Sequence, residues 1–194
     1  MNPPLRLTEA AILLSSYESS QPLDACFVHG LSKGMVDGVL ETVADLVKKE
    51  RVELIASNGD NGRGFNDDTP QAAWLGIDEY MNRFKVLGIP DEKIIPTTLP
   101  GRHTREENDA FLALAKEHGW KRVGVASGAH HMLRTFSGFV KIMQESGYEM
   151  DLYPIFPKNT KWNNTIYGSQ GLEQIPAHIL VEQELERCVA YAEK

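Results

Sequence analysis

The sequence predicts a three-layer, Rossmann-like α/β domain with a mostly parallel sheet of about five strands. Short apolar runs alternate along the chain with segments of helix length, a pattern typical of strand–helix–strand units in a parallel sheet. The 194 residues fit one domain, and a composition of 42% hydrophobic and 24% charged residues is that of a globular protein with a substantial core. We therefore expect a single domain over residues 1–194, with the strands in the order 3-2-1-4-5.

The first part of the chain begins with a predicted helix at residues 5–16. A buried first strand, Asp24–Val28, precedes a helix over Met35–Lys49, in which apolar residues recur every three or four positions. The second strand, Val52–Ala56, leads into a polar, glycine-rich loop that extends to Pro70.

The middle of the chain contributes two helices and one strand. A helix over Gln71–Leu87 ends before a glycine, with a proline two residues later. The third strand, Lys93–Pro96, is short because proline cannot donate a backbone hydrogen bond within a sheet. Thr104 and Glu107 match a capping box, Thr with Glu three residues later, and predict a helix that ends near His118.

The last part repeats the alternation. Arg122–Ala126 is the fourth predicted strand, and the helix after it extends to Gly147. Met150–Ile155 is the fifth strand and Phe156–Gln170 a long polar loop. Residues 173–193 are predicted to form a final helix that packs on the domain, as the N-terminal helix does.

The turn after the fourth strand is the most informative segment for function. Ser127 and Gly128 lie at the predicted bend, and His130, His131 and Arg134 follow at the start of the helix. A helix N-terminus offers unpaired N–H groups and a partial positive charge, which favour an anionic ligand. Because basic residues are ordinarily favoured at the other end of a helix, their crowding here indicates a ligand. The alternative is a helix that begins with basic residues by chance.

His131 and Arg134 lie three residues apart and are expected to share one helix face. We expect the planar guanidinium of Arg134 to hold a carboxylate or phosphate through two parallel hydrogen bonds, with His131 as the candidate catalytic acid or base. The competing structural role for Arg134 is a salt bridge to an acidic residue such as Asp60 or Glu107.

Ligands of open α/β sheets bind beyond the carboxyl ends of the strands. In the glycine-rich loop after the second strand, Asp60 could accept hydrogen bonds from ribose hydroxyls or an amine, and the alternative is a surface loop without function. We predict one crevice formed by the strand exits and by the helix starts behind them. The predicted ligand-binding residues are Gly30, Ser57, Asn58, Gly59, Asp60, Glu107, Asn108, Ser127, His130, His131 and Arg134.

Several familiar motifs are missing from the sequence. Neither the dinucleotide fingerprint G-x-G-x-x-G nor the phosphate-binding pattern G-x-x-x-x-G-K-[ST] follows the first strand. Ser127 does not lie in a G-x-S-x-G elbow, although a Ser127–His131 pair at helical spacing could activate a hydroxyl. His130 and His131 project about 100° apart on a helix, so they do not form the zinc-binding pair of a metalloprotease helix. No metal site is predicted.

Charge and hydropathy limit the class of partner. A net charge of −7 and a pI near 5.4 argue against a general nucleic-acid binder, but they allow a local basic pocket for a small anion. No apolar run approaches the roughly 20 residues that span a bilayer, and the N-terminus lacks the apolar core of a signal peptide. The sequence therefore predicts a cytoplasmic protein without a membrane anchor that binds a small molecule.

Four short segments occur in a characteristic order. Ser57–Gly59 follows the second strand, Leu87–Pro90 precedes the third, Glu107-Asn108 lies at a helix start, and Ser127–Arg134 follows the fourth strand. In this order they resemble the bacterial SanA/ElyC/YdcF-like family, long described as a domain of unknown function. The corresponding family segments are Ser-Gly-Gly, Leu-Gly-Val-Pro, Thr-x-Glu-Asn and Thr-Ser-aromatic-His-Met/Leu-x-Arg. The resemblance covers roughly residues 24–155.

Within the last of these segments, His131 and Arg134 match the family directly, whereas Ser127 replaces Thr and His130 replaces the aromatic residue. The family usually has Leu-Gly-Gly after the first strand, where this chain has His29-Gly30. One branch of the family is described as binding S-adenosylmethionine, so the resemblance implies that compound as a candidate cofactor. It implies no agreed reaction.

Three functions remain open at this stage. The first is binding of a small anionic, adenosyl- or nucleotide-like ligand at the carboxyl edge of the sheet, with no reaction assigned. The second is a hydrolase or transferase that acts on a phosphorylated or envelope-derived small molecule, with His131 as acid and base and Arg134 as anion clamp. The third is a non-catalytic interaction module.

Overall fold

Five parallel strands form the central sheet of the structure, a computed structural model that describes residues 14, 17–31, 35–59, 75–99, 101, 103–160, 162–163, 165–167 and 174–192. Every neighbouring pair of strands in this sheet is parallel, and the order is β3-β2-β1-β4-β5. The predicted fold class and strand order are therefore confirmed. The strands are β1 (Leu23–Val28), β2 (Val52–Ser57), β3 (Ile94–Pro96), β4 (Arg122–Ala126) and β5 (Asp151–Ile155).

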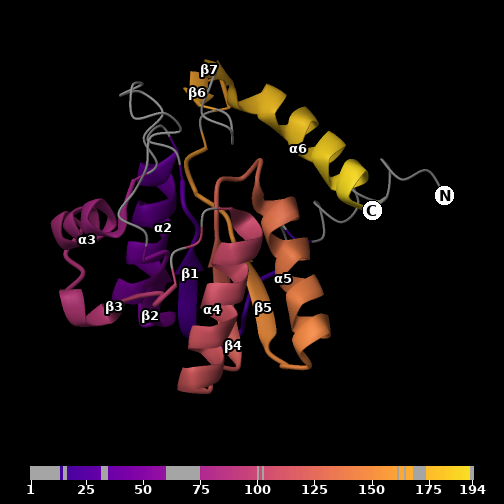
Figure 1. Cartoon of the computed structure of the whole chain (residues 1–194). Coiled ribbons are helices and arrows are strands. Elements are labelled where there is room, and N and C mark those ends of the chain that lie inside the picture. Colours follow the sequence, from indigo (N-terminus) through magenta and orange to yellow (C-terminus); the bar gives the residue numbers. More distant parts are fainter. Residues whose placement is uncertain are drawn as a thin grey trace.

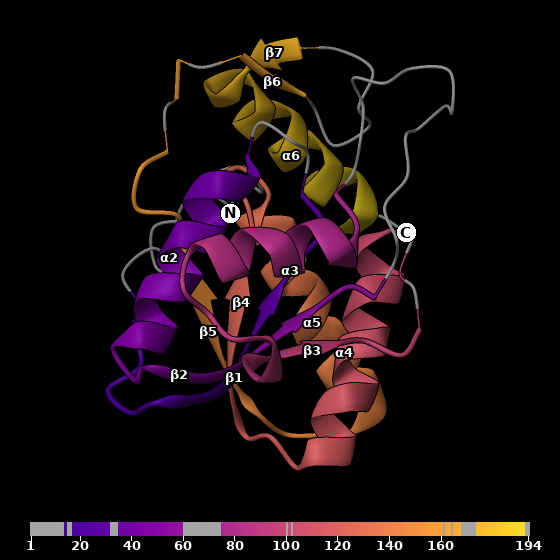
Figure 2. The same cartoon turned by 90° about the vertical axis from the view of Figure 1, so that its left-hand side faces the viewer.

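Helices cover both faces of this sheet and make three layers (Figure 1). One face packs against α2 (Val36–Lys48) and α3 (Ile77–Val86), and Figure 2 shows these two helices on the side turned toward the viewer. The other face packs against α4 (Thr104–His118) and α5 (Met132–Ser146). A 3-10 turn, Asp91–Lys93, leads into β3.

The alternation of side chains along β1 divides the core between these two faces. Cys26 and Val28 pack with α2 and α3, whereas Ala25 and Phe27 pack with α4 and α5. All four side chains are completely buried because helices cover both sides of a central parallel strand. The continuous apolar run in the first strand follows from this central position.

A second, two-stranded sheet and the last helix lie beyond the carboxyl ends of the central strands (Figure 1). β6 (Thr165–Tyr167) and β7 (Gln174–Pro176) pair antiparallel, and α6 (Ala177–Ala192) follows directly. Two predictions were wrong here, because the predicted loop Phe156–Gln170 contains a strand and the final helix begins at Ala177 instead of residue 173. Proline lacks a backbone N–H and disfavours helical backbone in the residue before it, so the segment up to Pro176 is extended and the helix starts after it.

Two further boundaries bear on the predicted elements. α3 was predicted to begin at Gln71, but it begins at Ile77, after an extended Gly76. Residues 71–74 lie outside the described residues. The predicted helix at 5–16 also lies outside them, apart from Leu14. α5 begins at Met132, so residues 127–131 form the turn that joins β4 to the helix.

Candidate functional site

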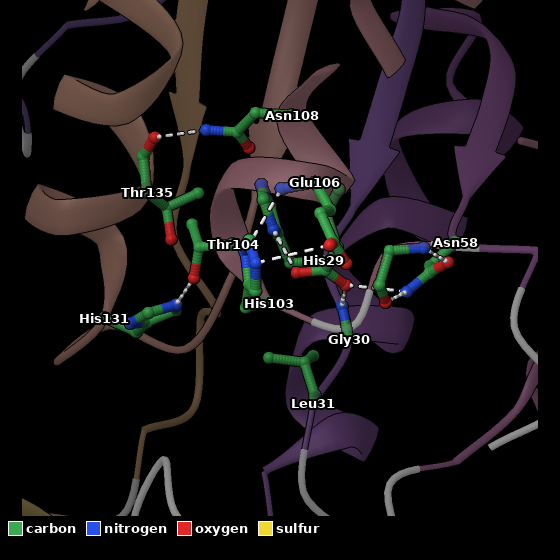
Figure 3. Close-up of polar contacts among 12 residues, drawn as sticks. His29, Gly30, Leu31, Asn58, His103, Thr104, Glu106, Asn108, His131 and Thr135 are labelled. Atoms are coloured by element: carbon green, nitrogen blue, oxygen red, sulfur yellow. Dashed lines mark hydrogen bonds and ion pairs between the residues drawn. The ribbon is translucent and has the colours of Figure 1, made fainter. Parts of the chain in front are cut away.

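The exits of β1 and β2 meet the start of α4 at the carboxyl edge of the sheet. His29 and Gly30 follow β1, Asn58 follows β2, and Asn108 lies near the start of α4 (Figure 3). Glu107 is the residue before Asn108 in the same helix. Hydrogen bonds join Glu107 to each of the three exit residues. Four of the predicted site residues, Gly30, Asn58, Glu107 and Asn108, are thus brought into one network.

Glu107 is the centre of this network. Its carboxylate accepts from the Gly30 N–H at 2.8 Å and the Asn58 amide at 3.1 Å, and it lies 3.1 Å from His29 Nδ1. Its side chain is 9% exposed. Burial by itself raises the pKa of the Glu107 carboxyl, but the bonds from His29, Gly30 and Asn58 outweigh burial and hold this pKa below its usual value. Glu107 is therefore a buried, ionised acceptor.

Asn58 carries the network on to the loop before α4. Its amide donates to the Gly101 carbonyl at 2.6 Å, and its side-chain oxygen accepts from the Gly101 N–H at 3.0 Å. A Cβ added to Gly101 would lie 2.6 Å from the backbone nitrogen of Glu107, so only glycine allows this approach. The neighbouring Gly59 is held by Thr97, whose hydroxyl accepts from the Gly59 N–H at 3.0 Å.

His29 is completely buried and was not among the predicted site residues. The Asn108 amide is satisfied when its nitrogen donates to His29 Nε2 at 3.2 Å and its oxygen accepts from the Phe139 N–H at 3.2 Å. His29 Nε2 is then an acceptor, so Nδ1 carries the ring proton and donates it to Glu107. Both ring nitrogens of His29 are engaged inside the protein.

The start of α4 differs from the predicted capping box. His103, not Thr104, is the N-cap residue, and its side chain accepts from the Glu106 N–H at 3.4 Å. Thr104 is the first helical residue, and the Glu107 side chain binds the strand exits instead of turning back to the helix start. The Glu107 carboxylate gains three buried hydrogen-bond donors at the strand exits, which favours this tertiary arrangement over a capping box at the start of α4.

A second network surrounds Glu184 of α6, which is 2% exposed. Its carboxylate accepts from Arg134 Nε at 2.6 Å and Arg187 Nη1 at 2.7 Å, and it lies 3.1 Å from His131 Nδ1. Burial raises the pKa of the Glu184 carboxyl, but the contacts with His131 and Arg134 outweigh it and hold this pKa well below its usual value. Glu184 was missed because no local sequence signal links the last helix to the fourth strand.

Arg134 therefore has a partner other than those considered from the sequence. The structural alternative, a salt bridge from Arg134 to an acidic residue, is what the structure shows, but the partner is Glu184 and not Glu107, and Asp60 lies outside the described residues. Two of the guanidinium nitrogens, Nε and Nη2, face the Glu184 carboxylate, and Nη1 donates to Thr104 Oγ1 at 3.1 Å. The planar group expected to hold a ligand thus holds α6 against α5.

His131 connects the second network to the start of α4. It occupies the N-cap position of α5, and its Nε2 lies 3.4 Å from Thr104 Oγ1, as Figure 3 shows. Burial lowers the pKa of His131, and the nearby Arg134 charge lowers it further, although the bond to Glu184 opposes both. His131 is therefore neutral at physiological pH.

The turn before α5 contains buried polar atoms without partners. Ser127 is completely buried and His130 is 6% exposed, yet within the described ranges neither Ser127 Oγ nor His130 Nε2 has a hydrogen-bond partner. Burial, followed by repulsion from His131, lowers the pKa of His130 to about 4. The first turn of α5 carries no acidic residue, and its N-cap makes no side-chain hydrogen bond.

The remaining predicted residues differ in their surroundings. Ser57 is buried, and its hydroxyl lies 3.5 Å from the Val28 carbonyl inside the sheet. A cavity of about 60 Å³ lies between the start of α5 and α6, far smaller than the roughly 300 Å³ or more of a typical ligand pocket. It is lined by Leu14, Ala129, His130, Met132, Leu133, Phe156, Val181, Glu184 and Leu185.

Comparisons with models of known protein families, with curated proteins and with solved structures find no match to this chain. Among the described residues, no group of three or more His, Cys, Asp or Glu side chains is placed to hold a metal ion. No helix in the same part of the chain is both long and apolar enough to cross a bilayer.

Glu107→Gln should lower the free energy of unfolding by about 2 kcal/mol, because a charged acceptor is lost and an amide N–H group is turned toward donors. Urea denaturation of the variant measures this loss. Glu106→Gln, an exposed change one residue away, is the matched control and should stay within about 0.5 kcal/mol of the parent. Equal stability of the two variants would contradict the role assigned to Glu107.

Acidification should destabilise the fold through His130. Its folded-state pKa of about 4 lies below the ordinary value of 6.5, so below pH 6.5 the unfolded chain binds a proton that the folded chain does not. This group alone should lower the free energy of unfolding by about 2 kcal/mol between pH 7 and pH 5. Denaturation at both pH values should show a smaller loss for His130→Gln than for the parent, while the exposed His178→Gln control keeps the parent's loss. An unchanged loss in His130→Gln would refute this assignment.

Proposed function

We propose that this chain binds a small anionic ligand at the carboxyl edge of the sheet, at the start of α5. The observation that carries the proposal is a pair of buried polar atoms, Ser127 Oγ and His130 Nε2, that have no hydrogen-bond partner within the described residues and lie in the turn before a helix whose first turn carries no acidic residue. A buried polar group without a partner costs about 1–3 kcal/mol, and a ligand that accepts or donates a hydrogen bond removes that cost.

The topology of the sheet supports the same location. In the order β3-β2-β1-β4-β5, the direction in which the chain adds strands reverses between β1 and β4. Ligands of doubly wound sheets bind in the crevice at such a reversal. The turn that begins at Ser127 leaves β4, and His29 and Gly30 leave β1, so both sets of residues lie at this reversal.

Charge supports an anion over a cation. Arg134, in the first turn of α5, places a positive charge beside the neutral His131. The backbone N–H groups of the first turn of α5 add a partial positive charge. Phosphate and carboxylate groups are the biological anions that such helix starts bind.

The ligand class proposed is adenosyl- or nucleotide-like. A phosphate of a nucleotide or the carboxylate of S-adenosylmethionine would occupy the start of α5, with the rest of the ligand extending along the exits of β1 and β2. The resemblance of the chain to the SanA/ElyC/YdcF-like family adds S-adenosylmethionine to the candidates.

A hydrolase or transferase is the second candidate. The observation that favours it is that the His131 ring is neutral and buried, and that its Nδ1 contacts the ionised carboxylate of Glu184. An imidazole held in this way is suited to accept a proton.

Native mass spectrometry of the freshly purified protein, followed by calorimetric titration with inorganic phosphate, AMP and S-adenosylmethionine, tests the proposal. We expect one equivalent of at least one of these anions to bind. Ser127→Ala should weaken that binding by about 3- to 10-fold, because one neutral hydrogen bond to the ligand is lost.

The same variant should keep or raise its melting temperature, because Ser127 Oγ has no partner in the described part of the chain. Ser137→Ala, at an exposed position of α5, is the matched control for both measurements. Failure of all three compounds to bind, or a Ser127→Ala protein that loses stability with unchanged affinity, would reject the proposal.

A further inference from the structure

Two Glu–His pairs lie at this edge of the sheet, and they differ in what the second ring nitrogen faces. His29 contacts Glu107 through Nδ1, and its Nε2 accepts from the buried Asn108 amide. His131 contacts Glu184 through Nδ1, but its Nε2 faces the hydroxyl of Thr104 at 3.4 Å (Figure 3). Both ring nitrogens of His29 therefore contact buried protein groups, whereas Nε2 of His131 faces the hydroxyl of the partly exposed Thr104.

Two groups face His131 Nδ1: the Glu184 carboxylate at 3.1 Å, which only accepts, and Arg134 Nη2 at 3.0 Å, which only donates. In the tautomer that donates from Nδ1 to Glu184, the Nε2 lone pair lies toward Thr104. Thr104 Oγ1 accepts from Arg134 Nη1 at 3.1 Å, and its own hydrogen is available to His131 Nε2. Carboxylate, imidazole and hydroxyl in this order are the arrangement that activates an alcohol nucleophile.

The position of Thr104 suits such a role. It is partly exposed and is the first residue of α4, and Arg134 Nη1 donates to its hydroxyl at 3.1 Å. The positive charge of Arg134 would stabilise negative charge that develops beside Oγ1. The distance of 3.4 Å is longer than a catalytic hydrogen bond, as is common in sites without a ligand, where such bonds tighten on binding.

We propose that Thr104 is the nucleophile, and His131 its general base, in acyl transfer from a small ester, an activity beyond the anion binding proposed above. Thr104 Oγ1 attacks the ester carbonyl while its proton moves to His131 Nε2. The bond from the acyl carbon to the leaving oxygen then breaks, and the leaving alcohol takes the proton from His131.

Water completes the cycle. It attacks the acyl group on Thr104, His131 Nε2 takes the proton of the water, and the bond to Oγ1 breaks. Thr104 regains its proton from His131, and a carboxylic acid is released. Glu184 stays ionised throughout and is a positioning residue, since its carboxylate binds the imidazole and the two arginines and not the reacting hydroxyl.

The test uses 4-nitrophenyl acetate with the full-length protein. We expect release of nitrophenolate and a mass increase of one acetyl group on the peptide that contains Thr104. Thr104→Val should abolish both signals, and Thr104→Ser should retain them. Glu184→Gln should slow nitrophenolate release by about 100-fold or more, because the imidazole loses its ionised partner. Glu182→Gln, at an exposed position of α6, is the matched control and should turn over like the parent.

The outcomes separate this inference from the proposed function. If the parent binds one of the anions above but no acetyl group reaches Thr104, or if Thr104→Val turns over as the parent does, the nucleophile assignment is overturned while anion binding stands. Acetylation of His131 in place of Thr104 overturns it as well. Thr104→Val leaves every contact of Glu184 intact, so it decides the question even if Glu184→Gln does not fold.

Discussion

The buried carboxylate of Glu107 is the interaction on which the edge of the sheet depends. Three segments that are far apart in the sequence meet at this one side chain: the exits of β1 and β2 and the first turn of α4. A buried charge is stable only when donors surround it, and here an imidazole, an amide and a backbone N–H supply them. Loss of the carboxylate would leave these donors without this acceptor in the core. The positions of the two strand exits therefore depend on the negative charge of Glu107.

Glu184 performs the corresponding function for the last helix. It binds Arg134, Arg187 and His131 at once and so joins α6 to the start of α5. The Glu184 carboxylate lies 3.1 Å from His131 Nδ1 and helps to orient the ring, whose Nε2 lies toward Thr104. The last helix therefore supplies a charged partner to the candidate site.

The strand order and the approximate place of the site followed from local sequence patterns. Apolar runs separated by helices specify a parallel sheet, and its carboxyl edge follows from the chain direction, so Gly30, Asn58, Glu107 and His131 were expected at one edge. What the sequence did not provide was the pairing among side chains. Arg134 binds Glu184, fifty residues away, and Glu107 binds strand exits in place of a helix cap, because burial favours tertiary contacts over the local motifs. The start of the last helix was set a few residues too early, because the apolar spacing of α6 resembles a helix that begins before Pro176.

The central claim is that an anion binds at the start of α5, and amide chemical shifts during a phosphate titration test it most directly. A two-dimensional ¹H–¹⁵N spectrum of the labelled protein reports each backbone N–H separately. The account predicts saturable shifts that are largest for residues 127–132, with smaller shifts for Gly30 and Asn58 and none for the exposed α3 residues Asp78 and Lys85. Shifts spread over exposed lysines without saturation, or a turn before α5 that does not respond, would contradict it.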